Sequence, residues 1–480
     1  MLKLTAPFIF LFLSTVVSVS QWQPDLRLTS DVTSSDLSSS WNIASSGSYI
    51  HIVWEDFESI FLNNKLLYKR SSDGGITWNS NIEFTTRTWQ IHYPAIACVG
   101  SDVHIVWSDY RDNNYEIYYK HSSNNGTSWG PDTRLTNNTF SGLNVSIAAV
   151  SPSGIHVVWS EAHDANNYEL HYTRSTDGGL NWQNEVRLTN APDRSQSPSI
   201  AALGLSVYIV WVDKRNGTED IYFKLSSDAG LNWSNDMELR NDTVNCFDPA
   251  IAVSGANVYV TWNNFRNDDF RVIFNRSTNG GMNWGTETNI TSDTVSSSGP
   301  SITASDSSVH LVWHNSLAGH SEVHYKLSTN IGSSWLPDMR FTTNSSLNAS
   351  VNVSGSAVYT IWEDFRDGNR EIYYKRNPTG SPLGVEIVNS VLPTSYLLKQ
   401  NYPNPFNPVT NINFSIPKAE FVNISVFDIL GRKINSLVDE WLNAGVYETD
   451  WDASAFPSGV YYYKFTAGDF SETRKMILIK

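Results

Sequence analysis

Short apolar segments that end in tryptophan recur along most of this chain. They read HIVW, HVVW, YIVW, YVTW, HLVW or YTIW, and their seven tryptophans lie 49 to 53 residues apart at Trp54, Trp107, Trp159, Trp211, Trp262, Trp313 and Trp362. Another apolar segment follows each copy, as in LLYK or IYYK, and shorter ones flank the pair, as in PAIA and TRLT. Four short strands in every ~50 residues are typical of propeller blades. The pattern therefore predicts an all-β, seven-bladed β-propeller over residues 21–376.

A turn motif accompanies six of the seven units. It has the form S-x-[DN]-x-G-x-x-W, with its acidic or amide residue at Asp73, Asn124, Asp177, Asp228, Asn279 and Asn330. We expect this side chain to bond backbone N–H groups two residues on, the glycine to supply a positive φ, and the tryptophan to cap the hairpin. The motif resembles the Asp-box of the sialidase-like BNR-repeat propellers, where it is a structural hairpin at the outer rim.

The seventh unit lacks its turn motif and its fourth strand. A candidate for the missing fourth strand lies at the other end of the repeats, because Trp22–Thr29 (WQPDLRLT) matches Trp129–Thr136 (WGPDTRLT) almost position for position. We therefore predict that residues 25–29 pair with the strand that contains Tyr373 and Tyr374. Such closure removes the exposed sheet edges of an open array.

The chain begins with the features of an export signal. Lys3 precedes an apolar run from Pro7 to Val17, and small residues at 18–20 suit cleavage before Gln21. Residues 1–20 are therefore predicted to be a signal peptide, and no later segment is apolar enough to be a transmembrane helix.

The repeats stop near Arg376, and a linker is predicted at 377–395. Residues 396–480 then alternate apolar and polar positions, which predicts a small antiparallel, Ig-like β-sandwich. This segment resembles the type A C-terminal sorting domain of the type IX secretion system, through YPNPFNP, the DILGR turn, SGVY and the terminal Lys475-Met476. The resemblance implies a Bacteroidetes-type bacterium, type IX secretion machinery as a partner, and a secreted or cell-surface location.

Composition narrows the possible ligands. The formal net charge is −15 and no basic patch is visible, which argues against a nucleic-acid partner. Cys98 and Cys246 are predicted to be buried free thiols. No cofactor and no metal site is predicted, although the Asp/Asn-rich stretch from Asp109 to Glu116 leaves Ca²⁺ open.

Charged and aromatic residues recur just after the seven repeated tryptophans, on the face that is expected to open onto the central funnel. Together with one loop tryptophan they form the predicted ligand-binding set, which is Asp109, Tyr110, Arg111, Asp213, Arg215, Phe265, Arg266, Asp364, Phe365, Arg366 and Trp89. Arginine and aspartate can bind sugar hydroxyls or carboxylates, and aromatic rings can stack on pyranoses. A structural role is the alternative, in which Asp caps its turn and Arg pairs with a neighbouring blade.

Several positions break the repeat. The third unit has Glu161 and His163 where others have Asp and Arg, the sixth has His314, and Arg87, His92 and Asp193-Arg194 lie between blades. By contrast, histidine and tyrosine occupy the same strand position in different units. This position is predicted to pack in the core rather than to ligate metal, and its histidines are His51, His104, His156 and His310.

The predicted function is binding of a glycan or a surface protein. A sialidase-like glycoside hydrolase or a lyase with a site in the funnel is the alternative. Binding is preferred because the propeller lacks a Phe-Arg-Ile-Pro-type segment, which carries the first arginine in sialidases, and because sialidases have six blades.

Overall fold

The computed structural model describes residues 22–30, 33–37, 41–57, 64–85, 90–137, 139–163, 167–240, 244–266, 268–292, 295–317, 319–343, 345–380, 386–389, 393–418, 420–442, 444–453 and 456–480. The chain divides into two compact units, Pro24–Gly380 and a unit that contains Ser381–Lys480. All regular secondary structure in the described residues is β-strand. The predicted signal peptide lies outside these residues.

Seven antiparallel sheets make up the described part of the first unit. The first contains β2 (Ser34–Asp36), β3 (Ile43–Ser46), β4 (Tyr49–Phe57), β5 (Asn64–Ser71) and β6 (Ile82–Glu83). The second contains β7 (Ile91–Val99), β8 (Asp102–Asp109), β9 (Glu116–Ser122) and β10 (Thr133–Arg134), and the third β11 (Gly142–Ala149), β12 (Ile155–Ala162), β13 (Tyr168–Ser175) and β14 (Val186–Arg187). The fourth contains β15 (Ser195–Leu203), β16 (Ser206–Asp213), β17 (Asp220–Ser226) and β18 (Met237–Glu238), and the fifth β19 (Cys246–Ser254), β20 (Asn257–Arg266), β21 (Asp269–Ser277) and β22 (Thr288–Asn289). The sixth contains β23 (Ser296–Ser305), β24 (Ser308–Leu317), β25 (His320–Ser328) and β26 (Met339–Arg340), and the seventh β27 (Ser346–Ser354), β28 (Ala357–Asp364), β29 (Glu371–Asn377) and β1 (Leu26–Arg27).

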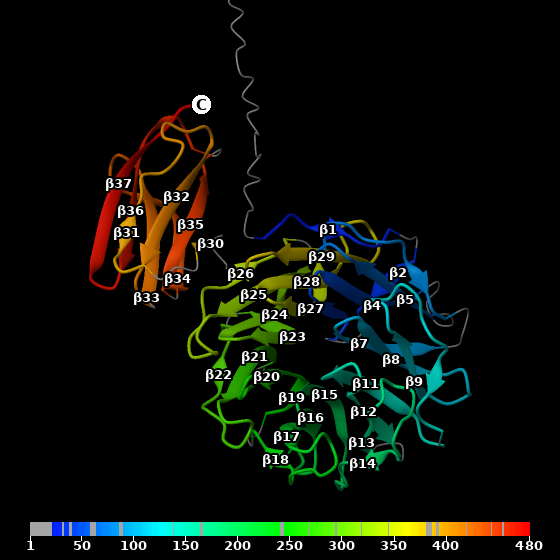
Figure 1. The fold of residues 1–480 in the computed structure, drawn as a ribbon. Helices are drawn as coiled ribbons and strands as arrows, with labels where there is room; N and C mark the ends of the chain where they lie inside the picture. Colours follow the sequence, from blue (N-terminus) through cyan, green and yellow to red (C-terminus); the bar gives the residue numbers. More distant parts are fainter. Residues whose placement is uncertain are drawn as a thin grey trace, which may run out of the picture. The chain divides into compact units, whose positions relative to one another are not determined.

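The sheets stand around a common centre (Figure 1). One strand of each sheet is innermost, and these strands contact one another in the order β3, β7, β11, β15, β19, β23, β27 and back to β3. The tryptophan of each second strand is completely buried, so the apolar strand pattern marks the packing between sheets. This arrangement is that of a β-propeller, as the repeats predict.

The N-terminal strand closes the ring, which confirms the prediction. In β1, Leu26 pairs with Tyr374 and Arg27 with Tyr373 of β29. Just beyond, the Thr29 hydroxyl donates a 2.5 Å hydrogen bond to the buried Glu371 carboxylate. The backbone N–H of Ile372 in turn donates to the Thr29 hydroxyl at 2.8 Å. The last sheet is therefore built from both ends of the unit.

The S-x-[DN]-x-G-x-x-W turns depart from expectation in one detail. In all six, the Asp or Asn oxygen accepts the backbone N–H four residues on, as Asp177 does from Asn181 at 2.9 Å, rather than two residues on. The motif tryptophan packs against apolar residues of its own sheet and of the preceding one. It packs edge-on against an aromatic ring of the preceding sheet, with 4.9 Å between the ring centres of Trp182 and Tyr119. The motif thus joins neighbouring sheets, and such pairs contribute roughly 0.5–1.5 kcal/mol beyond their buried area.

The glycine of this motif lies at that same junction. Its φ is between 71° and 85° in all six turns, as predicted. At Gly179 an added Cβ would lie 2.1 Å from the Tyr119 hydroxyl oxygen. A side chain is therefore excluded both by the backbone conformation and by the neighbouring sheet.

The histidines at the shared strand position pack in the core, as predicted. His51, His104, His156 and His310 are buried, and the Nδ1 of each lies 2.6–2.8 Å from the hydroxyl of a tyrosine on the next strand. Burial lowers their pKa values to about 3 or 4. They are therefore neutral structural groups near pH 7.

The second unit is a sandwich of two antiparallel sheets. One sheet contains β30 (Glu386–Asn389), β31 (Leu397–Leu398), β32 (Val409–Ile416) and β35 (Gly445–Asp452). The other contains β33 (Glu420–Phe427), β34 (Lys433–Leu442), β36 (Gly459–Ala467) and β37 (Phe470–Leu478). Their inner faces share one apolar core, in which the Phe414 and Phe465 ring centres are 5.3 Å apart. Strand β30 lies within the residues that were predicted to form a linker. It pairs with β35 and extends that sheet.

Candidate functional site

The innermost strands of six sheets share an irregularity near their first residues. The pairing of each with its neighbour slips there, for example between His92 and Ala95 in β7. One residue at each slip has a φ between 49° and 63°, and these residues are Tyr93, Asn144, Ser197, Asp248, Gly299 and Asn348. Five of them are not glycine. Bulges redirect side chains, and strained conformations of this kind cluster at functional sites.

The first sheet replaces the bulge with a longer excursion between β2 and β3. Its Trp41 packs against residues of the second and third sheets and also against residues of the fifth and sixth. Asn42 fixes the excursion, because its side-chain amide donates to the carbonyls of Val53 at 3.2 Å and Pro94 at 3.1 Å. Trp41 therefore reaches across the central channel of the ring.

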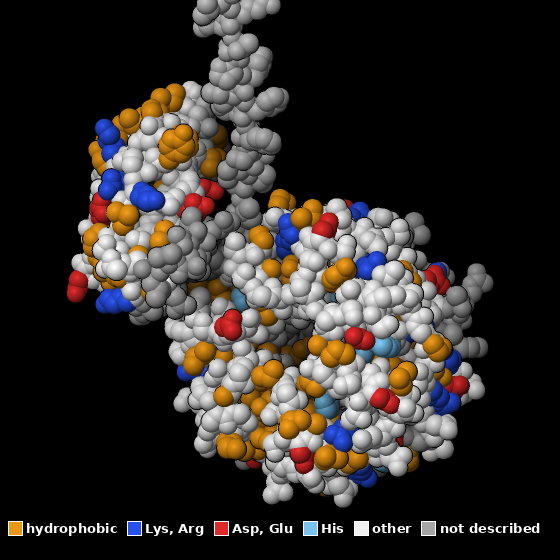
Figure 2. Space-filling model, in the orientation of Figure 1, with side chains coloured by type: hydrophobic (Ala, Val, Ile, Leu, Met, Phe, Trp, Pro, Cys, Tyr) orange, Lys and Arg blue, Asp and Glu red, His pale blue; other side chains and the backbone are white. Residues whose placement is uncertain are grey.

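The bulges and Trp41 line a cavity of about 220 Å³ at the mouth of the channel. A second cavity of about 210 Å³ lies deeper, between the aliphatic residues of the inner strands, and Trp41 borders both. The space-filling view shows the ring hollowed near its centre, with hydrophobic and histidine side chains around the hollow (Figure 2). We call the first cavity the channel-mouth pocket.

The channel-mouth pocket combines aromatic, amide, hydroxyl and carboxyl groups. Asp248 is the carboxylate among the described residues that line it. Its Oδ2 accepts a 2.9 Å hydrogen bond from the Asn263 amide, and the residue is exposed in the pocket. The wall of the pocket thus presents one carboxyl group that a ligand can reach.

A second acid supports the pocket from behind. The buried Glu363 carboxylate accepts hydrogen bonds from the Leu37 backbone N–H at 2.7 Å and the Asn348 amide at 2.9 Å. Burial, and then the nearby charge of Asp36, hold the pKa of Glu363 well above its ordinary value. Glu363 therefore connects the first and seventh sheets at the pocket and favours its protonated form.

Blades one and two supply a further asymmetric cluster. The buried Glu55 carboxylate accepts the Tyr93 backbone N–H at 2.9 Å, and its other oxygen lies 3.5 Å from His92 Nδ1. The His92 ring lies against the rings of Tyr93 and Tyr115. His92, which breaks the sequence repeat, thus adjoins the channel-mouth pocket.

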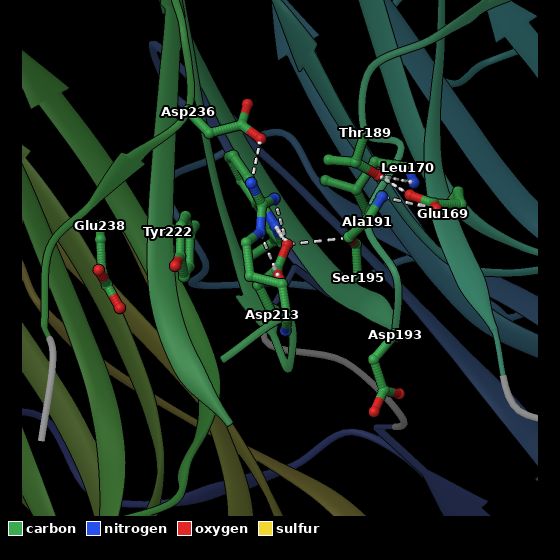
Figure 3. A network of polar contacts seen from close by, with 12 residues as sticks. Glu169, Leu170, Thr189, Ala191, Asp193, Ser195, Asp213, Tyr222, Asp236 and Glu238 are labelled. Carbon is green, nitrogen blue, oxygen red and sulfur yellow. Dashed lines mark hydrogen bonds and ion pairs between the residues drawn. The ribbon is translucent and has the colours of Figure 1, made fainter. Parts of the chain in front are cut away.

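Three aspartate–arginine pairs of the predicted set are each bonded within one blade. The Asp213 carboxylate accepts from Trp211 Nε1 at 2.8 Å, from the Ser195 hydroxyl at 2.9 Å and from the Arg215 guanidinium at 2.6 Å. Figure 3 shows Asp213 and Asp236 on either side of this network. Arg215 also bonds Asp236 at 2.8 Å and lies 4.5 Å from the Tyr222 ring centre.

The same arrangement recurs in two other blades, around Asp109–Arg111 and Asp364–Arg366. Each aspartate also accepts the backbone N–H two residues on, so it caps its turn. These bonds favour the structural alternative, with the arginine paired inside its blade rather than with a neighbour. Ligand binding by these six residues stays a prediction.

The aromatic members of the predicted set lie apart from the channel-mouth pocket. Tyr110 packs against Tyr115, and Phe265 against Phe270, with ring centres 5.0 and 4.9 Å apart. Phe365 borders a separate depression between the sixth and seventh sheets. Arg266 is exposed, and Trp89 lies outside the described residues.

Sequence reasoning missed Trp41, Asp248 and Glu363. A signal existed for Asp248, because the bulge residue precedes proline in four units, at Pro94, Pro198, Pro249 and Pro300. No metal site was predicted either. The structure nevertheless brings ligating atoms of Glu161, His163 and His171 within 4.8 Å of one another.

The fold is that of a β-propeller followed by a β-sandwich. Residues 400–480 match the family model described as "Secretion system C-terminal sorting domain", which marks this segment as an export signal, as its sequence predicts. A comparison with curated protein sequences found no match. Within the described residues we find no helix of the length and hydrophobicity that a membrane span requires.

Solved structures similar to this chain include glycan-active propellers. A polysaccharide lyase of family PL25, an ulvan lyase, has a TM-score of 0.49 at 10% identity, covering 71% of this chain and 93% of its own. An α-L-arabinofuranosidase of family GH93 from Fusarium graminearum has a TM-score of 0.45 at 13% identity, covering 61% and 94%. A Trypanosoma rangeli sialidase mutant has a TM-score of 0.41 at 11% identity, covering 83% and 85%.

Proposed function

We propose that this protein is exported by the type IX secretion machinery through its C-terminal, Ig-like sandwich, and that its closed seven-bladed propeller binds a glycan at the channel-mouth pocket. The observation that carries the binding proposal is the ring of left-handed bulge residues. Five non-glycine residues adopt this conformation at equivalent places and line one cavity with Trp41. Strained backbone conformations of this kind cluster at ligand sites, and here their side chains differ from sheet to sheet.

The chemistry of the pocket suits a sugar. Trp41 and Tyr93 offer ring surfaces, while Asn144, Ser197 and Asn348 are amides and a hydroxyl that can bond sugar hydroxyls. The volume of about 220 Å³ is below the roughly 300–1,000 Å³ of common ligand pockets. The pocket therefore suits one sugar residue, such as the end of a chain, better than a long oligosaccharide.

A glycoside hydrolase or lyase is the second candidate. It is favoured by the position of Asp248 on the wall of the pocket, because a carboxyl group within reach of a bound sugar can act as a general acid or base. The Glu55–His92 pair beside Tyr115 offers further acid–base groups close by. Binding is preferred because the described residues that line the pocket include one carboxylate, Asp248, whereas glycosidases use two carboxyl groups.

Tyr93→Asn tests the binding site without disturbing the bulge. Asparagine already occupies this position in the third and seventh sheets, at Asn144 and Asn348, with the same backbone conformation. We expect the affinity for a glycan that the wild-type protein binds to fall about tenfold, which corresponds to about 1.4 kcal/mol. The measurement is a glycan-array screen with the chain lacking residues 1–20, followed by calorimetry on the best ligand. Unchanged affinity in Tyr93→Asn would contradict the proposed location.

Two further variants separate the alternatives. Arg111→Ala should leave glycan affinity unchanged and lower stability, because Arg111 is held between Asp109 and Asp132. A weakened affinity in that variant would favour the predicted rim site instead. Asp248→Asn keeps the shape of the pocket and removes its acid. Release of sugar products by the wild type but not by Asp248→Asn would establish the enzyme.

A further inference from the structure

Three blades carry the same charged cluster beside the second-strand tryptophan. In the second blade, Arg111 lies between Asp109 at 2.6 Å and Asp132 at 2.9 Å, and over the Tyr118 ring at 4.2 Å. Lys120 binds Asp132 as well, at 2.7 Å. The fourth and seventh blades repeat this set of two aspartates, one arginine, one lysine and one tyrosine. In each, two cations neutralise two carboxylates.

The third blade changes all five positions. Strand register places His171 opposite Trp159, as Tyr118 lies opposite Trp107. Counted from the tryptophans of the same blade, Glu161 and Glu185 take the places of the aspartates, and His163 takes that of the arginine. Thr173 takes the place of the lysine and donates to the Gln183 carbonyl. Both cations are therefore lost while both carboxylates remain.

The replacement side chains converge on one point. His163 Nε2 lies 3.0 Å from His171 Nε2, which lies 3.8 Å from a Glu161 carboxylate oxygen. Two nitrogens on one tetrahedral zinc, bound at about 2.0–2.1 Å, lie about 3.3 Å apart. The observed separations are on either side of that value, so small rotations of the rings would admit an ion.

The surroundings hold the ligands in place. Glu161 and His171 are almost fully buried, at 2% and 5% exposure. The second Glu161 oxygen accepts from the buried Trp159 Nε1 at 3.2 Å, which leaves the first oxygen directed at the histidines. Such an outer hydrogen bond orients a metal ligand. On the other side, the Glu185 carboxylate lies 3.6 Å from His171 Nδ1 and is 38% exposed, so that side is open to solvent.

We propose that Glu161, His163 and His171 bind a divalent transition-metal ion, Zn²⁺ in the first instance, with water completing the coordination and Glu185 facing the other ring nitrogen of His171 as an outer partner. Two imidazoles and a carboxylate suit Zn²⁺ rather than Ca²⁺, which prefers oxygen ligands alone. The dication restores the charge balance that arginine and lysine provide in the three other blades. The ion would hold the end of β12 to β13 where the guanidinium does so elsewhere.

Zinc binding to the chelator-treated, untagged chain tests this site by calorimetry and by the visible spectrum of Co²⁺. We expect one ion per chain, a tetrahedral Co²⁺ spectrum, and at least tenfold weaker binding in His163→Ala, whose side chain is only partly buried. His121→Gln is the matched control, because His121 contacts a single carboxylate, Asp102, at 2.8 Å. This control should change the affinity less than twofold.

A second variant replaces five residues of the third blade with the residues found at the equivalent positions of the second blade. It carries Glu161→Asp, His163→Arg, His171→Tyr, Thr173→Lys and Glu185→Asp, in a turn that is one residue longer than in the second blade. Loss of Zn²⁺ binding with retained thermal stability supports the proposal. Zinc affinity that is equal in the wild type and His163→Ala, or a wild type that binds no zinc, overturns it.

Discussion

The buried histidine–tyrosine pairs make a measurable prediction about acid stability. His104 in the second blade pairs with Tyr119, whereas the fifth blade has Tyr259 and Phe274 at the same positions. The double substitution His104→Tyr/Tyr119→Phe therefore introduces a pair that this fold already accommodates. It should leave the ring intact and remove one titrating group.

The magnitude follows from proton linkage. Burial lowers the pKa of His104 to about 3, against 6.5 when unfolded. Stability from such a group is complete above pH 6.5 and is lost as the pH falls from there toward 3, because the unfolded chain binds the proton first. Between pH 8 and pH 5 the loss is about 2 kcal/mol for each such histidine.

Urea unfolding at pH 8 and pH 5, followed by tryptophan fluorescence, measures this loss. All eleven histidines precede residue 381, so the sandwich contributes no histidine titration. The double variant should lose about 2 kcal/mol less than the wild type between the two pH values. The reverse change in the fifth blade, Tyr259→His/Phe274→Tyr, should lose about 2 kcal/mol more. Equal losses in the wild type and both variants would refute the linkage.

Three further predictions concern packing between sheets, closure of the ring and export. Gly179→Ala should lower the unfolding free energy by about 3 kcal/mol or more, since its Cβ would overlap Tyr119, whereas Gly204→Ala, with positive φ but open space, should cost about 1 kcal/mol. Thr29→Val should cost about 1–3 kcal/mol by leaving the buried Glu371 short of a donor; stability equal to the wild type would show that closure does not depend on this bond. A chain that ends at Gly380 should fold with unchanged propeller stability and remain in the periplasm, and cell fractionation that finds it at the surface would contradict the export role.

The repeat itself was predictable from the sequence because every blade has the same packing requirements. A second-strand tryptophan needs the same buried space in every blade, and an Asp-box glycine such as Gly179 needs the same clearance. Each requirement restricts the residue type, so it appears as a period. The closing strand was found for the same reason, since Leu26 and Thr29 meet the requirements of a fourth strand.

The channel-mouth pocket could not be found in this way. Tyr93, Ser197 and Asp248 share a backbone conformation and not a side-chain type, so their equivalence is invisible until the register is known. Trp41 lies in an excursion that has no counterpart in the other blades. Its contacts across the channel depend on the closed ring, which no local pattern describes.

Repeated blades also provide internal controls that distinguish support from function. Arginine recurs between two aspartates in three blades, so its position is explained by the blade alone. In the third blade, His163 was visible as an exception, but one exception shows only that arginine is dispensable. The concerted loss of the lysine at Thr173, with retention of acids at Glu161 and Glu185, is different, because both carboxylates then lie beside His171. Two imidazoles and a carboxylate gathered at one place are a ligand set that Zn²⁺ takes, and this change of several positions together, rather than the single exception, is the basis for the proposed ion.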